Sequence, residues 1–305
     1  WSASTAWKAL RVRACCPGCW WCEGLHWGLR ALQTPVERTA RRKGLRYALR
    51  PSPRCLARAS FFAFILQVRP VPNPSLDTSR IRAISIDLDD TLWPIWPTIT
   101  RAESVLLDWL THHAPATAAL FSDTEALRAI RNQMVTLRPD LKGDLSALRR
   151  ESIRLALTQA GDEPALAEPA FDLFFAERQR VELFDDAHDT LAFLSARYPV
   201  VAVSNGNADI HRIGIGRYFR HSISASDFGI AKPDVRIFHA AATAVDVLPH
   251  EVLHVGDDAT LDAQGALNAG MQAVWVNSAN HPWPHDDTPP HATVDSLTAL
   301  CRLLA

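Results

Sequence analysis

The run AISIDLDDT at residues 83–91 decides the fold that this sequence predicts. It begins with four mostly apolar residues and then turns acidic. A short apolar run of this kind is typical of a strand buried in a parallel sheet. The carboxyl ends of parallel strands open onto the binding sites of such sheets. We therefore expect a buried strand at 83–86 that delivers the acidic residues to a site.

Four similar runs follow and predict further strands, at 200–203, 223–225, 252–255 and 273–276. Helical patterns lie between them, at 208–219, at 235–246 behind Asp234 as an N-cap, and at 260–269 before Gly270 as a stop. Strands that alternate with helices predict an α/β fold built on a doubly wound parallel sheet.

Residues 98–183 interrupt this alternation with about four amphipathic helical patterns, at 98–112, 123–137, 145–160 and 167–183. Because the block is inserted after the first strand, we expect a helical cap over the active edge of the sheet. Residues 81–97 and 184–305 would then form the core. The alternative is an unrelated helical domain elsewhere on the surface.

The charge of the chain is divided between an N-terminal segment and the remaining body. Residues 1–80 contain fourteen basic and three acidic residues, whereas residues 81–305 contain eighteen basic and thirty acidic residues, so the net charge of −1 conceals segments of +11 and −12. Five of the six cysteines also lie in residues 1–80, which leaves the body with Cys301. A body with one thiol suits a reducing compartment, and we expect a cytoplasmic protein.

Three interpretations compete for residues 1–80. The cluster of Cys15, Cys16, Cys19 and Cys22 is a candidate zinc site, although such sites usually need two ligand pairs separated by a longer loop. The arginine-rich composition also fits a transit peptide or an arm that binds nucleic acid. We favour a basic, poorly ordered or non-native extension without a functional role, and we expect no nucleic-acid partner.

We also expect no membrane insertion. The apolar run at 61–66 is far shorter than the roughly 20 residues that span a bilayer.

The segment HEVLH at 250–254 matches the HExxH pattern of zinc metalloproteases. That pattern needs a helix, in which positions i and i+4 share one face. Here Pro249 precedes the segment and a predicted strand begins at 252, and in an extended chain residues four apart lie roughly 13 Å from each other. Zinc–nitrogen bonds of about 2 Å cannot span that distance. We therefore interpret His250 as a loop residue and His254 as a strand residue with satisfied hydrogen bonds.

Four polar motifs occur in order along the body: DLDDT at 87–91, SNG at 204–206, KP at 232–233 and GDDATLD at 256–262. Three follow predicted strands, and one precedes a predicted helix. In these motifs the body resembles the haloacid dehalogenase (HAD) superfamily of phosphohydrolases, over residues 81–280. The resemblance implies a Rossmann-like core with an inserted helical cap.

The resemblance also implies a phosphatase that works through an aspartyl-phosphate. Asp87 would be the nucleophile, and Asp89 would be the general acid and base. Ser204 and the main-chain N–H of Asn205 would bind phosphate oxygens, and Lys232 would bind phosphate and neutralise developing charge.

A carboxylate nucleophile needs cations beside it, because at about 4 Å two like charges repel each other by roughly 4 kcal/mol at an effective dielectric near 20. The resemblance implies Mg²⁺, bound by the Asp87 carboxylate, the main-chain carbonyl of Asp89 and the acid Asp257, all oxygen ligands that suit this ion. Either Asp258 or Asp262 would orient the lysine. Both stay open, because the GDxxxxD spacing places Asp262 one position beyond the alternative GDxxxD form.

Two residues of the first motif refine this picture. Enzymes that cleave carbon–halogen bonds generally lack the second aspartate, because they need no acid for an alcohol leaving group, so Asp89 argues for phosphate over halide. We expect Thr91 to buttress the loop.

Candidates for substrate recognition lie beside the nucleophile and in the predicted cap. Trp93 and Trp96 would either stack on a planar ring or pack against the cap. Arg149 and Arg150 would either reach an extended substrate or lie on a solvated helix face.

Three stretches carry a closer resemblance: DLDDTLW at 87–93, SNGNAD at 204–209 and residues 251–276. They are similar to bacterial HAD phosphatases of flavin biosynthesis, which act on 5-amino-6-(5-phospho-D-ribitylamino)uracil and FMN. We therefore expect hydrolysis of a small-molecule phosphate ester. The alternatives are another phosphometabolite, such as a sugar phosphate or a nucleotide, and a catalytically silent binding protein on the same fold. No oligomeric state is predicted.

Overall fold

The computed structural model describes residues 75–141, 143–286 and 288–305. The cysteine cluster, the apolar run at 61–66 and nearly all of the basic extension lie outside the described residues. The described part contains no helix long and apolar enough to cross a membrane.

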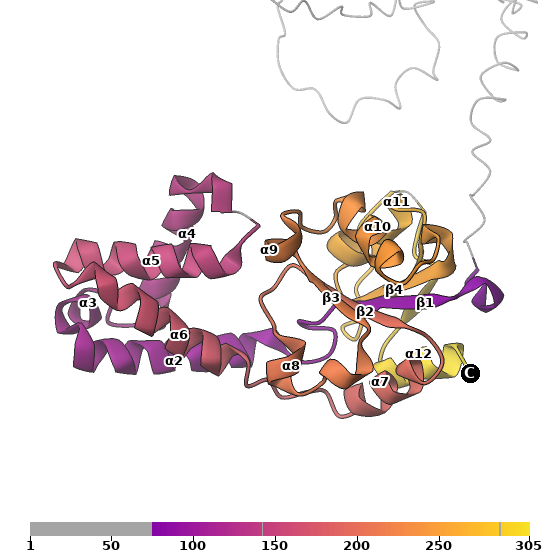
Figure 1. Cartoon of the computed structure of the whole chain (residues 1–305), viewed down its shortest axis with the longest axis horizontal. Coiled ribbons are helices and arrows are strands. Elements are labelled where there is room, and N and C mark those ends of the chain that lie inside the picture. The colour runs from indigo at the N-terminus through magenta and orange to yellow at the C-terminus, as the bar shows by residue number, and fades with distance from the viewer. Residues whose placement is uncertain (1–74, 142, 287) are drawn as a thin grey trace, which may run out of the picture. The chain divides into compact units, whose positions relative to one another are not determined.

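The described chain contains a six-stranded sheet, which lies in the right-hand part of Figure 1. Its strands run in the order β3-β2-β1-β4-β5-β6, and every neighbouring pair is parallel. Their bounds are β1 (Ala83–Ile86), β2 (Val200–Ser204), β3 (His221–Ser224), β4 (Val252–Gly256), β5 (Gln272–Val276) and β6 (Ala292–Val294). This order and these parallel pairings confirm the predicted doubly wound α/β sheet.

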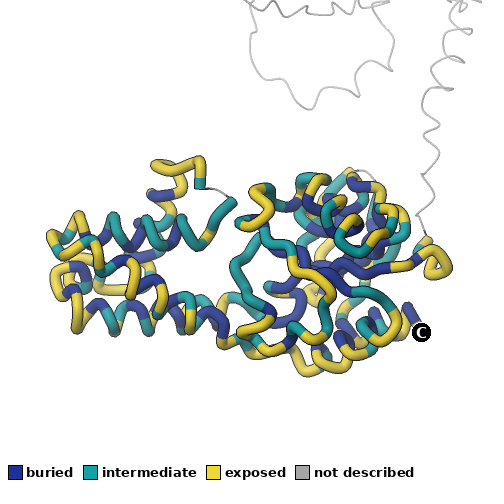
Figure 2. Tube along the Cα trace, in the orientation of Figure 1, coloured by how far each residue is buried: buried dark blue, intermediate teal, exposed yellow. Residues whose placement is uncertain are grey.

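Helices cover both faces of the sheet, because strand side chains alternate between the faces (Figure 1). In β1, Ile84 and Ile86 pack with α7 (Ala187–Ser195) and α12 (Leu297–Leu303). Ala83 faces the other way, into an apolar cluster with α10 (Val235–Ala244) and α11 (Gly265–Asn268). The central strands β1, β2, β4 and β5 are buried along their whole length, as Figure 2 shows in dark blue.

In the part of the chain that the structure describes, six α-helices lie between β1 and β2. The last, α7, packs against the sheet, and the first five pack around an apolar cluster of their own, formed mainly by side chains of α2, α5 and α6. Aspartate N-caps begin two of these helices: Asp123 accepts from the N–H of Ala126, and Asp144 accepts from the N–H of Ala147. The first five helices are α2 (Ile95–His113), α3 (Pro115–Leu120), α4 (Thr124–Leu137), α5 (Leu145–Ala160) and α6 (Ala167–Arg178). The division into core and cap at 97/98 and 183/184 stays a prediction.

Three local predictions are wrong. The helix predicted at 208–219 is broken, because α8 (Ile210–Ile213) ends at Gly214, whose φ of 91° only glycine adopts readily. Ala225 starts the short helix α9 (Ala225–Phe228) instead of ending a strand, because Ser224 caps that helix through the N–H of Asp227. The helix predicted at 260–269 is a π-helical turn, η7 (Ala259–Gln264), followed by α11.

Buried charge stabilises the helices between β1 and β2. The Glu103 side chain is 0% exposed, accepts from Arg128 Nε at 2.6 Å and pairs with the buried Arg149 at 3.2 Å. We expect Glu103→Leu to lower the free energy of unfolding by about 3–5 kcal/mol, because it leaves the Arg149 guanidinium buried without its partner. Urea denaturation measures this loss.

Two further variants control this experiment. Asp140→Ala, which breaks the exposed pair with Arg138, should change stability little. Adding Arg149→Met to Glu103→Leu should recover much of the lost stability, since it removes the unpaired charge. Equal losses for Glu103→Leu and Asp140→Ala would contradict the assignment.

Candidate active site

The site lies at the carboxyl ends of β1 and β4, where the strand order reverses. The chain proceeds from β1 to one side through β2 and β3, and to the other through β4 and β5. Open α/β sheets form a crevice at such a point. Asp87 directly follows β1, Asp257 directly follows β4, and Ser204 ends β2.

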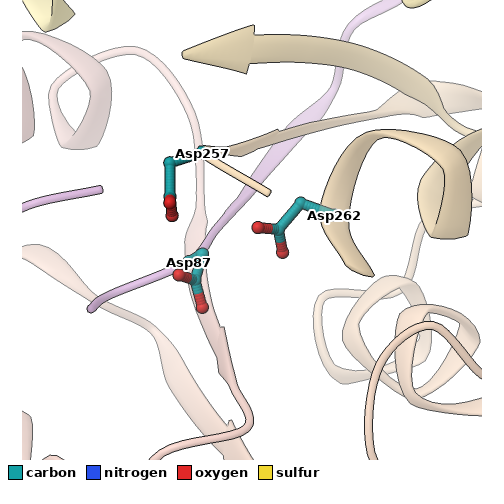
Figure 3. Close-up of side chains that lie close together, drawn as sticks. All are labelled: Asp87, Asp257 and Asp262. Atoms are coloured by element: carbon teal, nitrogen blue, oxygen red, sulfur yellow. The ribbon is translucent and has the colours of Figure 1, made fainter. Parts of the chain in front are cut away.

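Three carboxylates gather in this crevice (Figure 3). Ligand oxygens of Asp87, Asp257 and Asp262 all lie within 4.8 Å of one another. The buried ammonium of Lys232 donates to Asp262 Oδ1 at 2.6 Å and to Asp87 Oδ1. The structure therefore brings together the predicted nucleophile Asp87, the lysine Lys232 and the predicted metal-binding acid Asp257. A single ammonium faces three carboxylates.

The protonation equilibria follow from this crowding. Burial raises the pKa of Asp87 despite the opposing attraction of Lys232. Burial and the nearby Asp262 raise the pKa of Asp257 to about 7. Burial alone would raise the pKa of Asp262, but Lys232 and His254 lower it to about 2. Burial would likewise lower the pKa of Lys232, but Asp262 and Asp87 raise it above its usual value. Lys232 therefore stabilises the ionised forms of Asp87 and Asp262, the two acids that it contacts.

The geometry favours Asp262 over Asp258 as the residue that orients the lysine. The Asp258 carboxylate instead caps η7, where Oδ1 accepts from the N–H groups of Thr260 and Leu261 at 2.7 Å each. The π-helical turn explains the longer spacing, because the N–H of Ala263 bonds to the carbonyl of Asp258 five residues back. The wider turn accommodates the additional residue and still directs Asp262 to Lys232.

The second motif, SNG at 204–206, holds the backbone of Lys232 in place. Asn205 Oδ1 accepts from the main-chain N–H of Lys232 at 2.7 Å, and its Nδ2 donates to the Lys232 carbonyl at 3.0 Å. The buried Ser204 Oγ accepts from the N–H of Gly206 at 2.9 Å. The resemblance implied a role only for the main-chain N–H of Asn205, so the two hydrogen bonds of its side chain to the Lys232 backbone were not predicted. Phosphate binding by Ser204 and Asn205 stays a prediction.

Thr91 contacts the loop after β4, as expected of a buttress. Its Oγ1 donates to Asp257 Oδ1 at 3.0 Å and accepts from the Asp257 N–H at 3.1 Å. Trp275 Nε1 donates to the Asp257 carbonyl at 2.7 Å. Asp257 is therefore fixed from two sides.

Arg178 is a site residue that the sequence analysis missed. Its side chain is 2% exposed, and Nη2 donates to both carboxylate oxygens of Asp89 at 2.7 Å. Its Nε donates to Asn207 Oδ1 at 2.8 Å, and Asn207 Nδ2 donates to Ser146 Oγ in α5 at 3.1 Å. Arg178 is the last residue of α6, so it connects the helices between β1 and β2 to Asp89. No local pattern distinguishes it from the other arginines of those helices.

Trp93 packs in the apolar core, which favours the packing alternative over stacking on a substrate, and neither Arg149 nor Arg150 lines the crevice. Trp93 is 0% exposed, and its Nε1 donates to Asp89 Oδ1 at 2.9 Å, so it cannot stack on a ligand. Arg149 is buried against Glu103. Arg150 pairs with Glu168 at 2.9 Å, with its guanidinium over the ring of Phe171. Each of these three side chains already contacts an acidic side chain of the protein.

Trp96 is different, because 61% of it is exposed. It lines a hollow beside the crevice, and the two cavities share residues Asp89, Ile95, Leu145 and Gly206. The hollow has a volume of about 160 Å³ and the crevice one of about 280 Å³. A ligand that reacts in the crevice can therefore extend toward Trp96.

The donor set fits a hard divalent cation. The clustered ligands are all carboxylate oxygens, and one lysine leaves an excess of negative charge among them. Oxygen donors are those that Mg²⁺ prefers. Asp262 also contacts His254 and accepts from the main-chain N–H of Asp258, so the carboxylates of Asp87 and Asp257 are the ones that would hold such an ion.

Comparisons with known proteins agree with this geometry. A family model described as haloacid dehalogenase-like hydrolase matches residues 81–270. The chain is 34% identical over 233 residues to the 5-amino-6-(5-phospho-D-ribitylamino)uracil phosphatase YigB of Escherichia coli, covering 74% of this chain and 97% of that protein. It is 35% identical to the phosphoserine phosphatase of Thermus thermophilus, but over 46% of this chain and 59% of that protein.

A solved structure described as the 2-haloacid dehalogenase of Pseudomonas syringae pv. Tomato has a similar fold. It is 36% identical with a TM-score of 0.68, and the match covers 73% of this chain and 98% of that one. Both full-length matches therefore extend well beyond the motifs, through the helices between β1 and β2.

Asp262 packs closely against Gly256, the last residue of β4, so a larger residue at 256 should destabilise the protein. A Cβ on Gly256 would lie within 3.0 Å of the Asp262 carboxyl carbon. We expect Gly256→Ala to displace Asp262 and to lower the free energy of unfolding by about 1–3 kcal/mol, as overpacking of a buried position does. Thermal or urea denaturation measures the change.

Gly143→Ala is the matched control, because a Cβ there would meet no atom within 4 Å. If both variants shifted the unfolding midpoint equally, the close packing at Gly256 would not be the cause.

Proposed function

The chain belongs to the haloacid dehalogenase-like hydrolases and is a phosphoric monoester hydrolase, and we propose that it cleaves a small-molecule phosphate ester with the help of Mg²⁺. The observation that carries the proposal is the cluster at the carboxyl ends of β1 and β4, in which Lys232 links Asp87 to Asp262 beside Asp257. A carboxylate nucleophile beside a fixed cation suits attack on an anionic phosphate.

In the first step, Asp87 attacks phosphorus and forms an aspartyl-phosphate, while the bond from phosphorus to the leaving oxygen breaks. Asp89, which must enter this step protonated although it accepts from Arg178 in this structure, gives its proton to that oxygen, which leaves as an alcohol. In the second step, Asp89 takes a proton from water, whose oxygen attacks phosphorus and releases phosphate and free Asp87. The Lys232 ammonium offsets the charge that develops on the phosphoryl oxygens.

Mg²⁺ would be held by the carboxylates of Asp87 and Asp257 and by the main-chain carbonyl of Asp89. When bound, it supplies positive charge that lets an anionic nucleophile approach an anionic phosphate. Thr91 and Trp275 keep Asp257 in position for this role.

Asp89 supports phosphate as the substrate, although several similar solved structures are described as dehalogenases. Cleavage of a phosphate ester releases an alkoxide that needs a proton, whereas halide leaves without one. The Asp89 carboxylate borders the crevice and is oriented by Arg178 and Trp93.

We propose 5-amino-6-(5-phospho-D-ribitylamino)uracil or FMN as the substrate. The relative with that phosphatase activity in its name matches over 97% of its length. Both compounds carry a planar ring, and the exposed Trp96 lines the hollow next to Asp89. Aromatic stacking on a heterocycle contributes about 1–3 kcal/mol. Sugar phosphates and nucleotides are the competing substrates.

Replacement of the nucleophile tests the mechanism. Asp87→Asn should fold normally and lose measurable phosphatase activity on p-nitrophenyl phosphate in Mg²⁺, because an amide cannot form the aspartyl-phosphate. Asp108→Asn, the same change at an exposed position of α2, is the control and should keep full activity.

Two results would contradict this mechanism. One is turnover by the folded Asp87→Asn variant, and the other is full activity of the unmodified protein in EDTA. If neither that protein nor the Asp108→Asn control hydrolysed any phosphate ester, a binding protein on the same fold would be favoured instead.

Replacement of the exposed tryptophan tests the substrate class. Trp96→Leu should lower kcat/KM for FMN and the ribitylaminouracil phosphate about tenfold, equivalent to about 1.4 kcal/mol of lost stacking. Ribitol 5-phosphate, which has no ring, should be hydrolysed at an unchanged rate. Trp96→Phe should retain most of the activity on ring substrates. An equal effect on all three substrates would exclude stacking on Trp96.

A further inference from the structure

A buried imidazole contacts the acid that pairs with the catalytic lysine. His254 lies in β4 and is 0% exposed. Its Nε2 lies 3.2 Å from Asp262 Oδ1, and its Nδ1 lies 2.8 Å from Ser85 Oγ in β1. The Phe238 ring packs against it in a T-shaped arrangement, with centroids 4.9 Å apart. A continuous chain of polar contacts therefore runs from Ser85 through His254 and Asp262 to the lysine.

The partners of His254 define its tautomer. Asp262 also accepts from Lys232, so its carboxylate is ionised and acts only as an acceptor. Nε2 must then carry the proton and donate to Asp262. Nδ1 is left as an acceptor, and the Ser85 hydroxyl donates to it. This arrangement satisfies every polar atom of the ring at a position without access to water.

The Asp262 carboxylate has little freedom as a result. Its Oδ1 accepts from Lys232 and His254, and its Oδ2 accepts from the main-chain N–H of Asp258 at 3.1 Å. The lysine ammonium takes its direction from this carboxylate and points at Asp87. A shift of Asp262 would therefore move the positive charge away from the nucleophile.

We propose that His254 is a positioning residue for phosphoryl transfer, whose Nε2–H holds the Asp262 carboxylate and through it directs Lys232 at Asp87. The proposal rests on the proposed phosphatase function, because the lysine acts on the phosphoryl group. His254 itself does not touch substrate. The family's motifs in this sequence give no role to this histidine. It belongs to the segment HEVLH at 250–254, which matches a zinc motif, but it lies in the strand β4 and not on a helix.

Matched variants distinguish positioning from packing. The amide of His254→Gln provides an N–H donor in place of Nε2–H, whereas His254→Leu fills space without a donor. With p-nitrophenyl phosphate and Mg²⁺, we expect His254→Leu to lower kcat about 10- to 100-fold, the usual effect of losing the partner of a site residue. KM should change little, and His254→Gln should restore most of kcat.

A double-mutant cycle on the full chain tests the route through Asp262. In an Asp262→Asn background, His254→Leu should cause little further loss, because its effect is already absent. Additive losses, or equal losses in folded His254→Gln and His254→Leu, would overturn the proposal. If the leucine variant fails to fold, the cycle is run with His254→Met, which also lacks an N–H donor.

An NMR measurement separates this proposal from the proposed function. Long-range ¹H–¹⁵N spectra of the ring should show the Nε2–H tautomer in the unmodified protein, whatever its activity. The Nδ1–H tautomer would overturn the proposal. An unmodified protein with the expected tautomer but no phosphatase activity would instead refute the function.

Discussion

The Lys232 ammonium, buried between the carboxylates of Asp87 and Asp262, is the interaction on which the rest of the site depends. Three acids with oxygens within 4.8 Å repel one another strongly, by roughly 4 kcal/mol for a pair at about 4 Å and an effective dielectric near 20. The Lys232 ammonium relieves part of this repulsion. The negative charge that it does not offset attracts a divalent cation. The loops after β1 and β4 and the turn η7 all converge on that charge.

The sequence predicted the sheet and most of this cluster for the same physical reason. Each apolar run is short and ends in polar residues, and parallel strands align their carboxyl ends. Asp87 and Asp257 were therefore expected at one edge, whereas the resemblance to the family, and not the strand pattern, implied that Lys232 lies beside them. The strand β6 escaped prediction because its three residues are only partly buried and show no apolar run. Glycine at 214 broke a helix that apolar periodicity alone had extended.

The residues that prediction missed act through contacts between distant segments. Arg178 reaches Asp89 from 89 residues further along the chain, and a helical pattern contains no signal for this. Arg149 was expected on a substrate or a solvated face, because a periodic pattern gives the face of a residue but not its neighbours. The choice between Asp258 and Asp262 depended on a π-helical turn, which differs from an α-helix by a single residue of spacing.

The contact of Arg178 with Asp89 has a consequence for the construction of chimeras. The helices between β1 and β2 look interchangeable, since they are linked to the sheet by two short segments and pack around their own apolar cluster. Yet the last residue of α6 belongs chemically to the crevice, where it binds both oxygens of Asp89. A transplant of these helices into a related scaffold must therefore place its junction beyond Arg178 and Gln179, whose side chain bonds to the backbone of Asn207 and Asp209. A junction placed before Arg178 would exchange the helices but would omit Arg178 and Gln179, the residues of this protein that connect them to the crevice.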